Sequence, residues 1–326
     1  MMFLYKILQM FKSKKNSILV ILFFLISCTI TAQQTITSRY LMDDVFSKSL
    51  EKIIHNAGLD SSYNVGEDGF KHISFAVIDL TGKKPVLGGV HYNNFIYPAS
   101  VYKMYVAMEV LKQVNEGKYS LYTPYVIKAH NEVDKISEIN YDPRPLLKAG
   151  DTVTINYLLD LMITRSDNTA ANCMIDIAGR KQINTTIQSF YWNGSEVTRK
   201  FLKRKFEDPG YDTIKGTETC ALHAADFMNR IYNNKLVDPW VSMQLKSLLG
   251  RQLDTTKLST GLPKGAMFYH KTGWWSYYTH DVGIVDDGFV KYIIALFVPL
   301  TEDQARPKMK EISEKIYALI KQRHNH

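Results

Sequence analysis

Short apolar runs that are typical of β-strands lie towards both ends of the chain, and amphipathic segments fill its middle. The run HISFAVIDL is followed by the turn pair Thr81-Gly82, which favours a hairpin with the next apolar run. The turn Asp286-Asp287-Gly288 separates two later runs in the same way. The predicted strands are His72–Leu80, Pro85–His91, Met267–Lys271, Tyr277–Val285 and Val290–Val298.

Hydrophobic residues at helical spacing predict helices between and outside these strands. Two segments follow neither pattern: Tyr119–Gly150 is predicted to be a long surface excursion, and the basic segment Trp192–Lys215 a long ordered loop. The predicted helices are Ser38–His55, Ser100–Gln113, Thr154–Ile163, residues 169–177, Lys181–Phe190, Glu218–Tyr232, Trp240–Leu249 and Thr301–Lys321.

The order of these elements predicts an α+β fold with two lobes. An antiparallel sheet is built from both chain ends and covered by the terminal helices, which gives an α/β lobe of about residues 38–95 and 262–323. The middle, about residues 96–261, forms an inserted all-helical lobe. The cleft between two such lobes is the expected place for a functional site.

The N-terminus has the order of a secretory signal peptide over residues 1–32. Basic residues precede the apolar run Ile18–Leu25, and the small and polar residues Ser27–Ala32 follow it. Two outcomes stay open: cleavage after Ala32, or lipidation of Cys28, because Leu25-Ile26-Ser27-Cys28 resembles a bacterial lipobox. Either outcome predicts an exported protein, periplasmic or lipid-anchored outside the cytoplasm.

Composition excludes several classes of protein. With 326 residues and 45% hydrophobic content, the chain is neither disordered nor collagen-like. Four lysines and no acid in residues 1–32 leave a net charge of +4 on the rest, which is too weak for a nucleic-acid-binding surface. A disulfide between Cys173 and Cys220 stays open, although two buried thiols are favoured. Nothing implies a metal or an organic cofactor, and a monomer is expected.

The first candidate for chemistry is Ser100-Val101-Tyr102-Lys103, at the predicted start of an apolar helix. Positions i and i+3 share a helix face, so the serine hydroxyl and the lysine amine can meet. A desolvated lysine can lose its charge and act as the base that a serine nucleophile needs. The alternative is a serine that caps the helix and a solvated lysine.

The second candidate, Ser166-Asp167-Asn168, lies between two predicted helices. The Ser166 hydroxyl can relay a proton, and the Asn168 amide can bind a substrate amide. The alternative is that Asp167 or Asn168 only caps the following helix.

The third candidate, Lys271-Thr272-Gly273, ends a predicted strand. Lys271 and Thr272 can hold a substrate carboxylate, and Gly273 allows a substrate backbone to approach closely. The alternative is an edge-strand lysine followed by a turn glycine.

The three motifs together indicate one chemistry. S-x-x-K, S-D-N and K-T-G in this order are the signature set of class A β-lactamases and penicillin-binding proteins. Their flanks, GDTVTINYLLDLMITRSDNTAAN and HKTGWWSYYTHDVGIV, agree with it. Over about residues 38–323 the chain resembles class A β-lactamases and their serine-hydrolase relatives. The resemblance implies an acyl-enzyme mechanism on a fold with one α/β and one all-helical lobe.

The resemblance also implies roles for individual residues. Ser100 is the expected nucleophile, Lys103 its base, and Ser166 the relay to the leaving nitrogen with Lys271 nearby. Asn168 is expected to bind a side-chain amide of the substrate. Thr272 is expected to contact its carboxylate. The backbone N–H groups of Ser100 and Trp274 are expected to form the oxyanion hole, an arrangement typically worth several kcal/mol at the transition state.

One family motif is missing. β-Lactamases of this family carry R-x-E-x-x-L-N, whose glutamate activates the water that hydrolyses the acyl-enzyme. If Arg199 matches the arginine, Phe201 stands where the glutamate is expected and Lys205 where the asparagine is expected. Glu207 is the nearest substitute, and a surface position is favoured for it.

These observations favour a class A-type β-lactamase that hydrolyses the β-lactam amide. A penicillin-binding or peptidase-like enzyme acting on cell-wall peptides, or another amide or ester hydrolase with slow deacylation, is the alternative. The complete Ser100, Lys103, Ser166 and Lys271 set argues against a third possibility, a binding protein without turnover.

Overall fold

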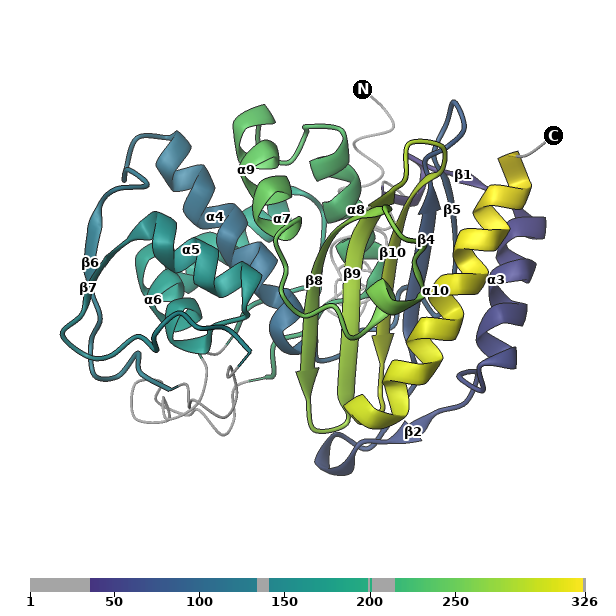
Figure 1. Cartoon of the computed structure of the whole chain (residues 1–326), viewed down its shortest axis with the longest axis horizontal. Helices are drawn as coiled ribbons and strands as arrows, with labels where there is room; N and C mark the ends of the chain where they lie inside the picture. The colour runs from purple at the N-terminus through teal and green to yellow at the C-terminus, as the bar shows by residue number, and fades with distance from the viewer. Residues whose placement is uncertain (1–35, 134–140, 199, 201–214, 325–326) are drawn as a thin grey trace, which may run out of the picture.

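The structure, a computed structural model, describes residues 36–133, 141–198, 200 and 215–324. In this part of the chain a six-stranded sheet lies beside a group of helices (Figure 1). The strands of the sheet are β1 (Leu41–Met42), β4 (Ser74–Asp79), β5 (Val86–Val90), β8 (Met267–Trp275), β9 (Tyr278–Asp286) and β10 (Lys291–Val298).

The two ends of the chain build the sheet together. Its strand order is β1-β5-β4-β10-β9-β8, and all neighbours are antiparallel except β1 and β5. β4 from the N-terminal part pairs with β10 from the C-terminal part, with Asp79 opposite Tyr292. β8 therefore forms one edge of the sheet, beside the helices.

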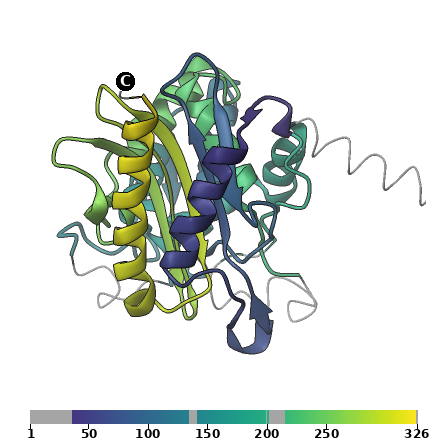
Figure 2. The same cartoon turned by 90° about the vertical axis from the view of Figure 1, so that its right-hand side faces the viewer.

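The central strands are buried on both faces because successive side chains point to opposite sides of a sheet. On β4, Phe75 and Val77 pack into a core under α3 (Asp44–Asn56) and α10 (Glu302–His324). Figure 2 shows these two helices side by side over the outer face. Ala76 and Ile78, which alternate with them, belong to the second core on the other side of the sheet.

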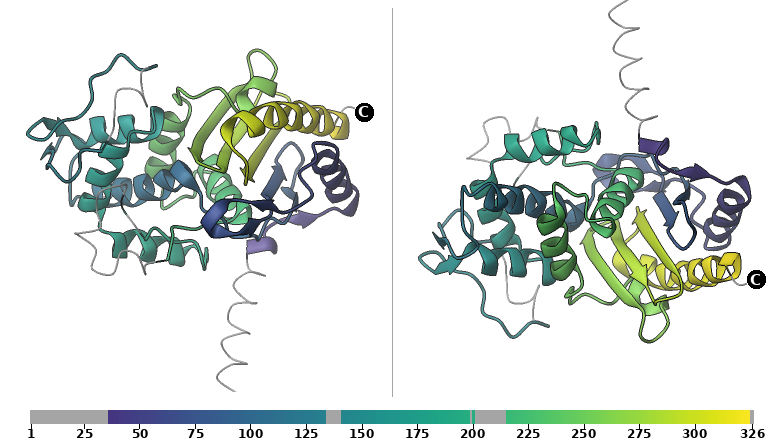
Figure 3. Two further views of the ribbon diagram at one scale, coloured as in Figure 1. Left: turned by 90° about the horizontal axis from the view of Figure 1, so that it is seen from below. Right: turned by 90° about the horizontal axis from the view of Figure 1, so that it is seen from above.

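Helix α4 lies at the centre of the helical group and is buried around most of its circumference. It packs against α5, α6, α7 and α9, whereas α8 packs against β4, β9 and β10. Figure 3 shows the helical group and the sheet side by side from below and from above. The helices are α4 (Lys103–Asn115), α5 (Ile155–Thr164), α6 (Asn168–Ala178), α7 (Arg180–Ser189), α8 (Ala221–Tyr232) and α9 (Pro239–Leu249).

The predicted fold class is confirmed, and several predicted boundaries are wrong. The first helix begins at Asp44 rather than Ser38, because the Asp43 side chain accepts hydrogen bonds from the backbone N–H groups of Val45 and Phe46. Strand β8 continues beyond Lys271 to Trp275, since it pairs with β9 along this whole length.

Some short elements were not predicted as separate elements. Each has too few residues to show a periodic pattern. They are β1, β2 (Tyr63–Asn64), β3 (Phe70–Lys71), β6 (Pro124–Val126), β7 (Thr152–Thr154), and the 3₁₀ turns η2 (Gly66–Asp68), η3 (Ala99–Tyr102) and η6 (Leu258–Gly261).

Several predictions fall on residues outside the described ranges: the signal peptide, lipidation of Cys28, and most of the loop around Glu207. Among the helices that are described, none is long and apolar enough to cross a membrane. Cys173 and Cys220 are both buried and do not form a disulfide with each other. Burial raises the pKa of the Cys220 thiol to about 12, so this thiol stays protonated at neutral pH.

The end of α10 is tied to the beginning of the described chain. Arg323 donates through Nη2 to the Asp43 carboxylate at 3.0 Å and through Nε to Asp79 at 3.2 Å. Arg323 and Asp79 are 244 positions apart, so this contact joins the C-terminal helix to a strand from the N-terminal part of the described chain.

Candidate active site

Ser100 lies in the 3₁₀ turn η3, which runs directly into α4. The prediction of an α-helix starting at Ser100 is wrong by three residues, because α4 begins at Lys103. Ala99, before Ser100, has φ +44°, a left-handed conformation that is unfavourable for a residue other than glycine. Strained backbone of this kind is concentrated at functional sites.

Lys103 is fully buried, and other residues of the predicted site surround its amine. Its Nζ donates to the Ser166 carbonyl at 2.5 Å and to Asn168 Oδ1 at 2.7 Å, and Ser166 Oγ is 3.3 Å away. Lys103 therefore does not face solvent, and that alternative for the first motif is excluded.

Ser166 lies between α5 and α6 and has φ +63°. The next residue, Asp167, is the N-cap of α6 and accepts from the backbone N–H of Ala170 at 2.7 Å. The capping interpretation is therefore right for Asp167. Helix capping does not explain the positions of the Ser166 and Asn168 side chains, which both contact Lys103.

Lys271 reaches the same serine from strand β8. Its Nζ donates to Ser166 Oγ at 3.0 Å and to its neighbour's carbonyl, Thr272 O, at 2.8 Å. Burial, followed by the positive charge of Lys103, holds the pKa of Lys271 well below its usual range. The Ser166 hydroxyl thus lies between two buried amines that come from different lobes.

Gly273 brings the backbone of β8 against the turn that carries Ser100. A Cβ atom at Gly273 would lie 2.8 Å from the Pro98 carbonyl oxygen and 2.9 Å from the Ser100 nitrogen. Because side chains do not fit at such distances, only glycine allows this approach. Next to it, Thr272 is buried, whereas the indole of Trp274 is 51% exposed.

The structure thus brings Ser100, Lys103, Ser166, Asn168, Lys271 and Gly273 to one place, and we call Ser100, Lys103, Ser166 and Lys271 the serine–lysine cluster. Glu207 and Phe201 lie outside the described residues. In the described ranges, no group of three or more His, Cys, Asp or Glu side chains is arranged to hold a metal ion.

One residue beside the cluster was missed by the sequence prediction. Arg165, directly before Ser166, is fully buried and ion-paired with Asp167 at 2.7 Å. The signal available in the sequence is a charged residue at the end of the apolar run LLDLMIT. Spacing alone does not show that such an arginine is buried.

Comparison with known proteins agrees with this fold. The chain is 24% identical over 225 residues to the extended-spectrum β-lactamase PER-1 of Pseudomonas aeruginosa, covering 64% of this chain and 68% of that protein. Among solved structures, PBP-A superimposes with a TM-score of 0.71 at 21% identity, over 85% of this chain and 97% of that one. A single-residue variant of PBP-A, solved as its acyl-enzyme complex with penicillin G, gives a TM-score of 0.69 at 20% identity, over 84% and 97% of the two chains.

The family match covers most of the chain. Residues 50–320 match the beta-lactamase enzyme family, a range that includes all three motifs and both lobes. This chain therefore belongs to the beta-lactamase enzyme family.

Proposed function

We propose that this protein is an exported serine hydrolase that forms an acyl-enzyme on Ser100 and hydrolyses the amide bond of β-lactams. The observation that carries the proposal is the position of the Ser166 hydroxyl, 3.0 Å from Lys271 Nζ and 3.3 Å from Lys103 Nζ. This arrangement connects a base beside the nucleophile to a second hydroxyl that can pass a proton on.

The proposed acylation step uses Ser100 together with these residues. The Ser100 oxygen attacks the carbonyl carbon as its proton moves to the Lys103 amine, and a C–O bond forms. In its neutral form the Lys103 amine has a lone pair that accepts this proton, and Ser166 O and Asn168 Oδ1 are among the acceptors that hold the amine in place. As the C–N bond breaks, the leaving nitrogen takes a proton from Ser166, which Lys103 replaces.

The backbone supports the charge that develops on the carbonyl oxygen. The N–H groups of Ser100 and Trp274 are the proposed donors, and the close approach of Gly273 to Ser100 places the two backbone segments together. Removing one such donor typically costs about 3 kcal/mol of transition-state stabilisation. Lys271 and Thr272 are the proposed donors to the carboxylate of a β-lactam.

A peptidase-like activity on cell-wall peptides is the second candidate. The observation that favours it is Phe201, at the position where the resemblance places the deacylating glutamate. Without a positioned base, hydrolysis of the acyl-enzyme is expected to be slower by a factor of about 10²–10⁴. The protein would then be acylated by penicillins and would release them slowly.

Nitrocefin turnover measured together with intact protein mass tests the proposal. Stoichiometric addition of the β-lactam mass is expected under both candidate functions. Sustained turnover identifies a β-lactamase, and a long-lived adduct identifies a slowly deacylating enzyme. A protein that is neither acylated nor active with nitrocefin would contradict the proposal.

Export has its own test. N-terminal sequencing and mass of the mature protein are expected to give either Gln33 as the first residue or a lipidated Cys28. An unprocessed N-terminus on protein from the native cell would contradict the proposed export.

A further inference from the structure

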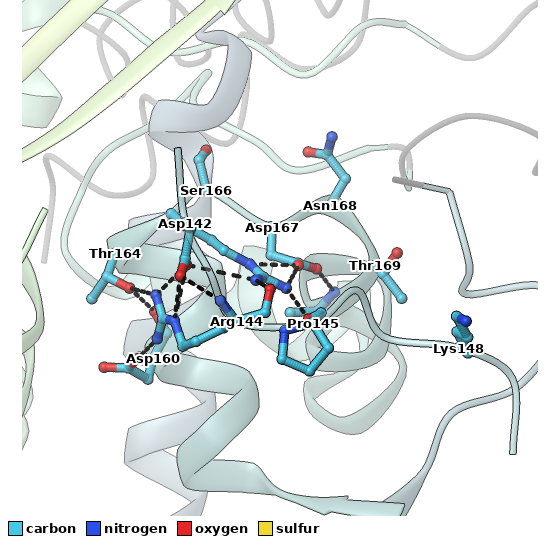
Figure 4. Close-up of polar contacts among 12 residues, drawn as sticks. Asp142, Arg144, Pro145, Lys148, Asp160, Thr164, Ser166, Asp167, Asn168 and Thr169 are labelled. Atoms are coloured by element: carbon cyan, nitrogen blue, oxygen red, sulfur yellow. Dashed lines mark hydrogen bonds and ion pairs between the residues drawn. The ribbon is translucent and has the colours of Figure 1, made fainter. Parts of the chain in front are cut away.

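Five charged side chains form a connected group beside the loop that carries Ser166. Two arginines and three aspartates come from three places: the segment before β7, helix α5 and the α5–α6 connection. Figure 4 shows their contacts. We call this group the arginine network; its members are Asp142, Arg144, Asp160, Arg165 and Asp167.

Arg165 connects the Ser166 loop to the segment before β7. Its Nε and Nη2 donate to Asp167 Oδ2 at 3.1 and 2.7 Å. Its Nη1 and Nη2 donate to the backbone carbonyls of Arg144 at 2.8 Å and Pro145 at 3.0 Å. A guanidinium has a fixed fork of five donors, so these partners fix its orientation as well as its position.

Arg144 fixes the other side of the connection. Its Nε donates to both carboxylate oxygens of Asp142, at 3.0 and 2.9 Å, and its Nη2 to Thr164 Oγ1 at 3.0 Å. It also forms an ion pair with Asp160 on α5. The segment 142–145 is thus held against the end of α5, directly before the Ser166 loop.

Both neighbours of Ser166 are held while Ser166 itself is in the left-handed region. The Arg165 carbonyl accepts from the Tyr141 hydroxyl at 2.9 Å, and the Asp167 N–H donates to the Leu161 carbonyl at 3.1 Å. In Figure 4 the side chains of Ser166 and Asn168 point away from the carboxylate of Asp167, which faces the network. A strained residue persists only where its surroundings determine its conformation.

We propose that Arg165 is a positioning residue, whose buried contacts to Asp167 and the 144–145 backbone hold Ser166 in the conformation that places its hydroxyl between Lys103 and Lys271. The role of Ser166 in this inference rests on the proposed function. Replacing buried ion pairs by apolar residues is often neutral or stabilising, so stability alone is a weak reason for this network. The arginine network instead fixes the geometry of the loop that carries Ser166.

The test uses the full mature protein and the rate of acylation by benzylpenicillin, followed by intact mass. Arg165→Lys keeps the charge but has one donor centre, and Arg165→Met removes the charge. We expect the limiting acylation rate to fall about 100-fold in Arg165→Met, the size expected for a misplacement of about 1 Å, and less in Arg165→Lys. The dissociation constant of the non-covalent complex should change little in both.

A double-mutant cycle with Ser166→Ala separates positioning from general stability. If Arg165 acts through the Ser166 hydroxyl, Arg165→Lys costs much less in the Ser166→Ala background than in the wild type. An equal cost in both backgrounds would overturn the inference. The matched control is Arg230→Met, which breaks an ion pair with the buried Asp226 (2.8 Å) on α8 and should leave acylation per folded molecule unchanged.

Hydrogen exchange provides a readout that does not depend on activity. The amides of Asp167, Ala170 and Ala171, which are hydrogen-bonded in the structure, should exchange faster in Arg165→Lys and not in Arg230→Met. Unchanged exchange in Arg165→Lys would overturn the inference. If the wild type is never acylated, the proposed function fails, and the exchange result still decides whether Arg165 holds this loop.

Discussion

The serine–lysine cluster is proposed to act in acylation and the loop Val197–Lys215 in deacylation. The two regions differ in how many of the family's motif residues they contain. The cluster contains the serines and lysines of the three family motifs that we propose for acylation, and both of its lysines are buried. The loop lacks the R-x-E-x-x-L-N pattern and carries six basic residues against three acids, unlike an acidic site. One scaffold thus combines the residues proposed for acylation with a loop that lacks the family's deacylation motif.

The ends of that loop are nevertheless fixed. Glu196 and Glu218 exchange backbone hydrogen bonds at 3.0 and 3.3 Å, so the two ends lie next to each other. Asn184 on α7 makes two further hydrogen bonds to the backbone of Val197. The difference between the loop and the cluster therefore lies in the residue types of the loop, since hydrogen bonds fix both ends of the loop.

The largest expected effect is that of Ser100→Ala. Removing the nucleophile should abolish covalent addition of a penicillin, and peptide mapping of the wild type should find the adduct on the Ser100 peptide. The reason is that no C–O bond can form without this hydroxyl. Undiminished labelling of Ser100→Ala, or an adduct on another peptide, would contradict the assignment of Ser100 as the nucleophile.

Lys103→Arg should lower the acylation rate by about 10²–10⁴-fold, the usual contribution of a positioned base. Arginine keeps a positive charge but does not deprotonate in proteins, so it cannot accept the Ser100 proton. The rate is measured by intact mass, with circular dichroism as the check that the fold is kept. Near-normal acylation in this variant would show that another group is the base.

A smaller effect is expected from pH, through a buried histidine that supports the segment before Ser100. His280 donates from Nε2 to the Tyr97 carbonyl at 2.9 Å and accepts from the Val298 N–H at Nδ1, 3.2 Å away. Burial lowers the pKa of His280 to about 3. The unfolded chain takes up this proton at about pH 6.5, so the free energy of unfolding should fall as pH drops from about 6.5 towards 3, by about 1.4 kcal/mol per pH unit for this one group.

Urea unfolding of wild type and His280→Gln at several pH values measures this effect. Glutamine can donate to the same carbonyl and does not titrate. The free energy of unfolding of the variant should therefore depend less steeply on pH, by the amount that corresponds to one proton. His223, whose pKa burial lowers to about 4, contributes to both proteins and cancels in the comparison. Identical slopes would contradict the assignment of a neutral His280.

The smallest expected effect is that of Glu207→Gln. If no acid of the loop reaches the acyl-enzyme, stopped-flow traces should show a burst followed by slow turnover in both wild type and variant. Fast wild-type turnover that collapses in Glu207→Gln would mean that this residue replaces the missing glutamate. Fast turnover unaffected by the substitution would mean that another group activates the water.

Sequence patterns predicted the fold well where hydrophobic periodicity is long. The five predicted strands and the central helices exist, since each buries a regular face. Boundaries set by single contacts were missed: only the capping contacts of Asp43 show that α3 starts at Asp44, and β1 has two residues. The 3₁₀ turn η3, which carries Ser100, lies against Gly273 of β8, and the sequence pattern does not show such a tertiary contact.

The candidate site was predicted from the three motifs and their resemblance to a family, and in the structure Lys103 and Lys271 both contact Ser166. The arginine network could not be predicted in this way. The hydrogen bonds from Arg165 to the carbonyls of Arg144 and Pro145 join residues 21 and 20 positions apart across an irregular segment, where no period relates one residue to another. Burial of Arg165 is a consequence of packing that the sequence does not show.

The pairing of β4 with β10 has a consequence for how the chain folds. Strand β4, in the middle of the sheet, pairs with β10, which is synthesised near the end of the chain. The chain between these two strands, which includes the helical group, therefore forms one long loop that closes when they pair. Closing so long a loop is slow, because the chain loses conformational entropy before the contacts between the distant strands form and stabilise the fold. Until β10 arrives, one edge of β4 offers unpaired backbone groups to other chains, so an incomplete chain is exposed to aggregation in a way that the finished protein is not.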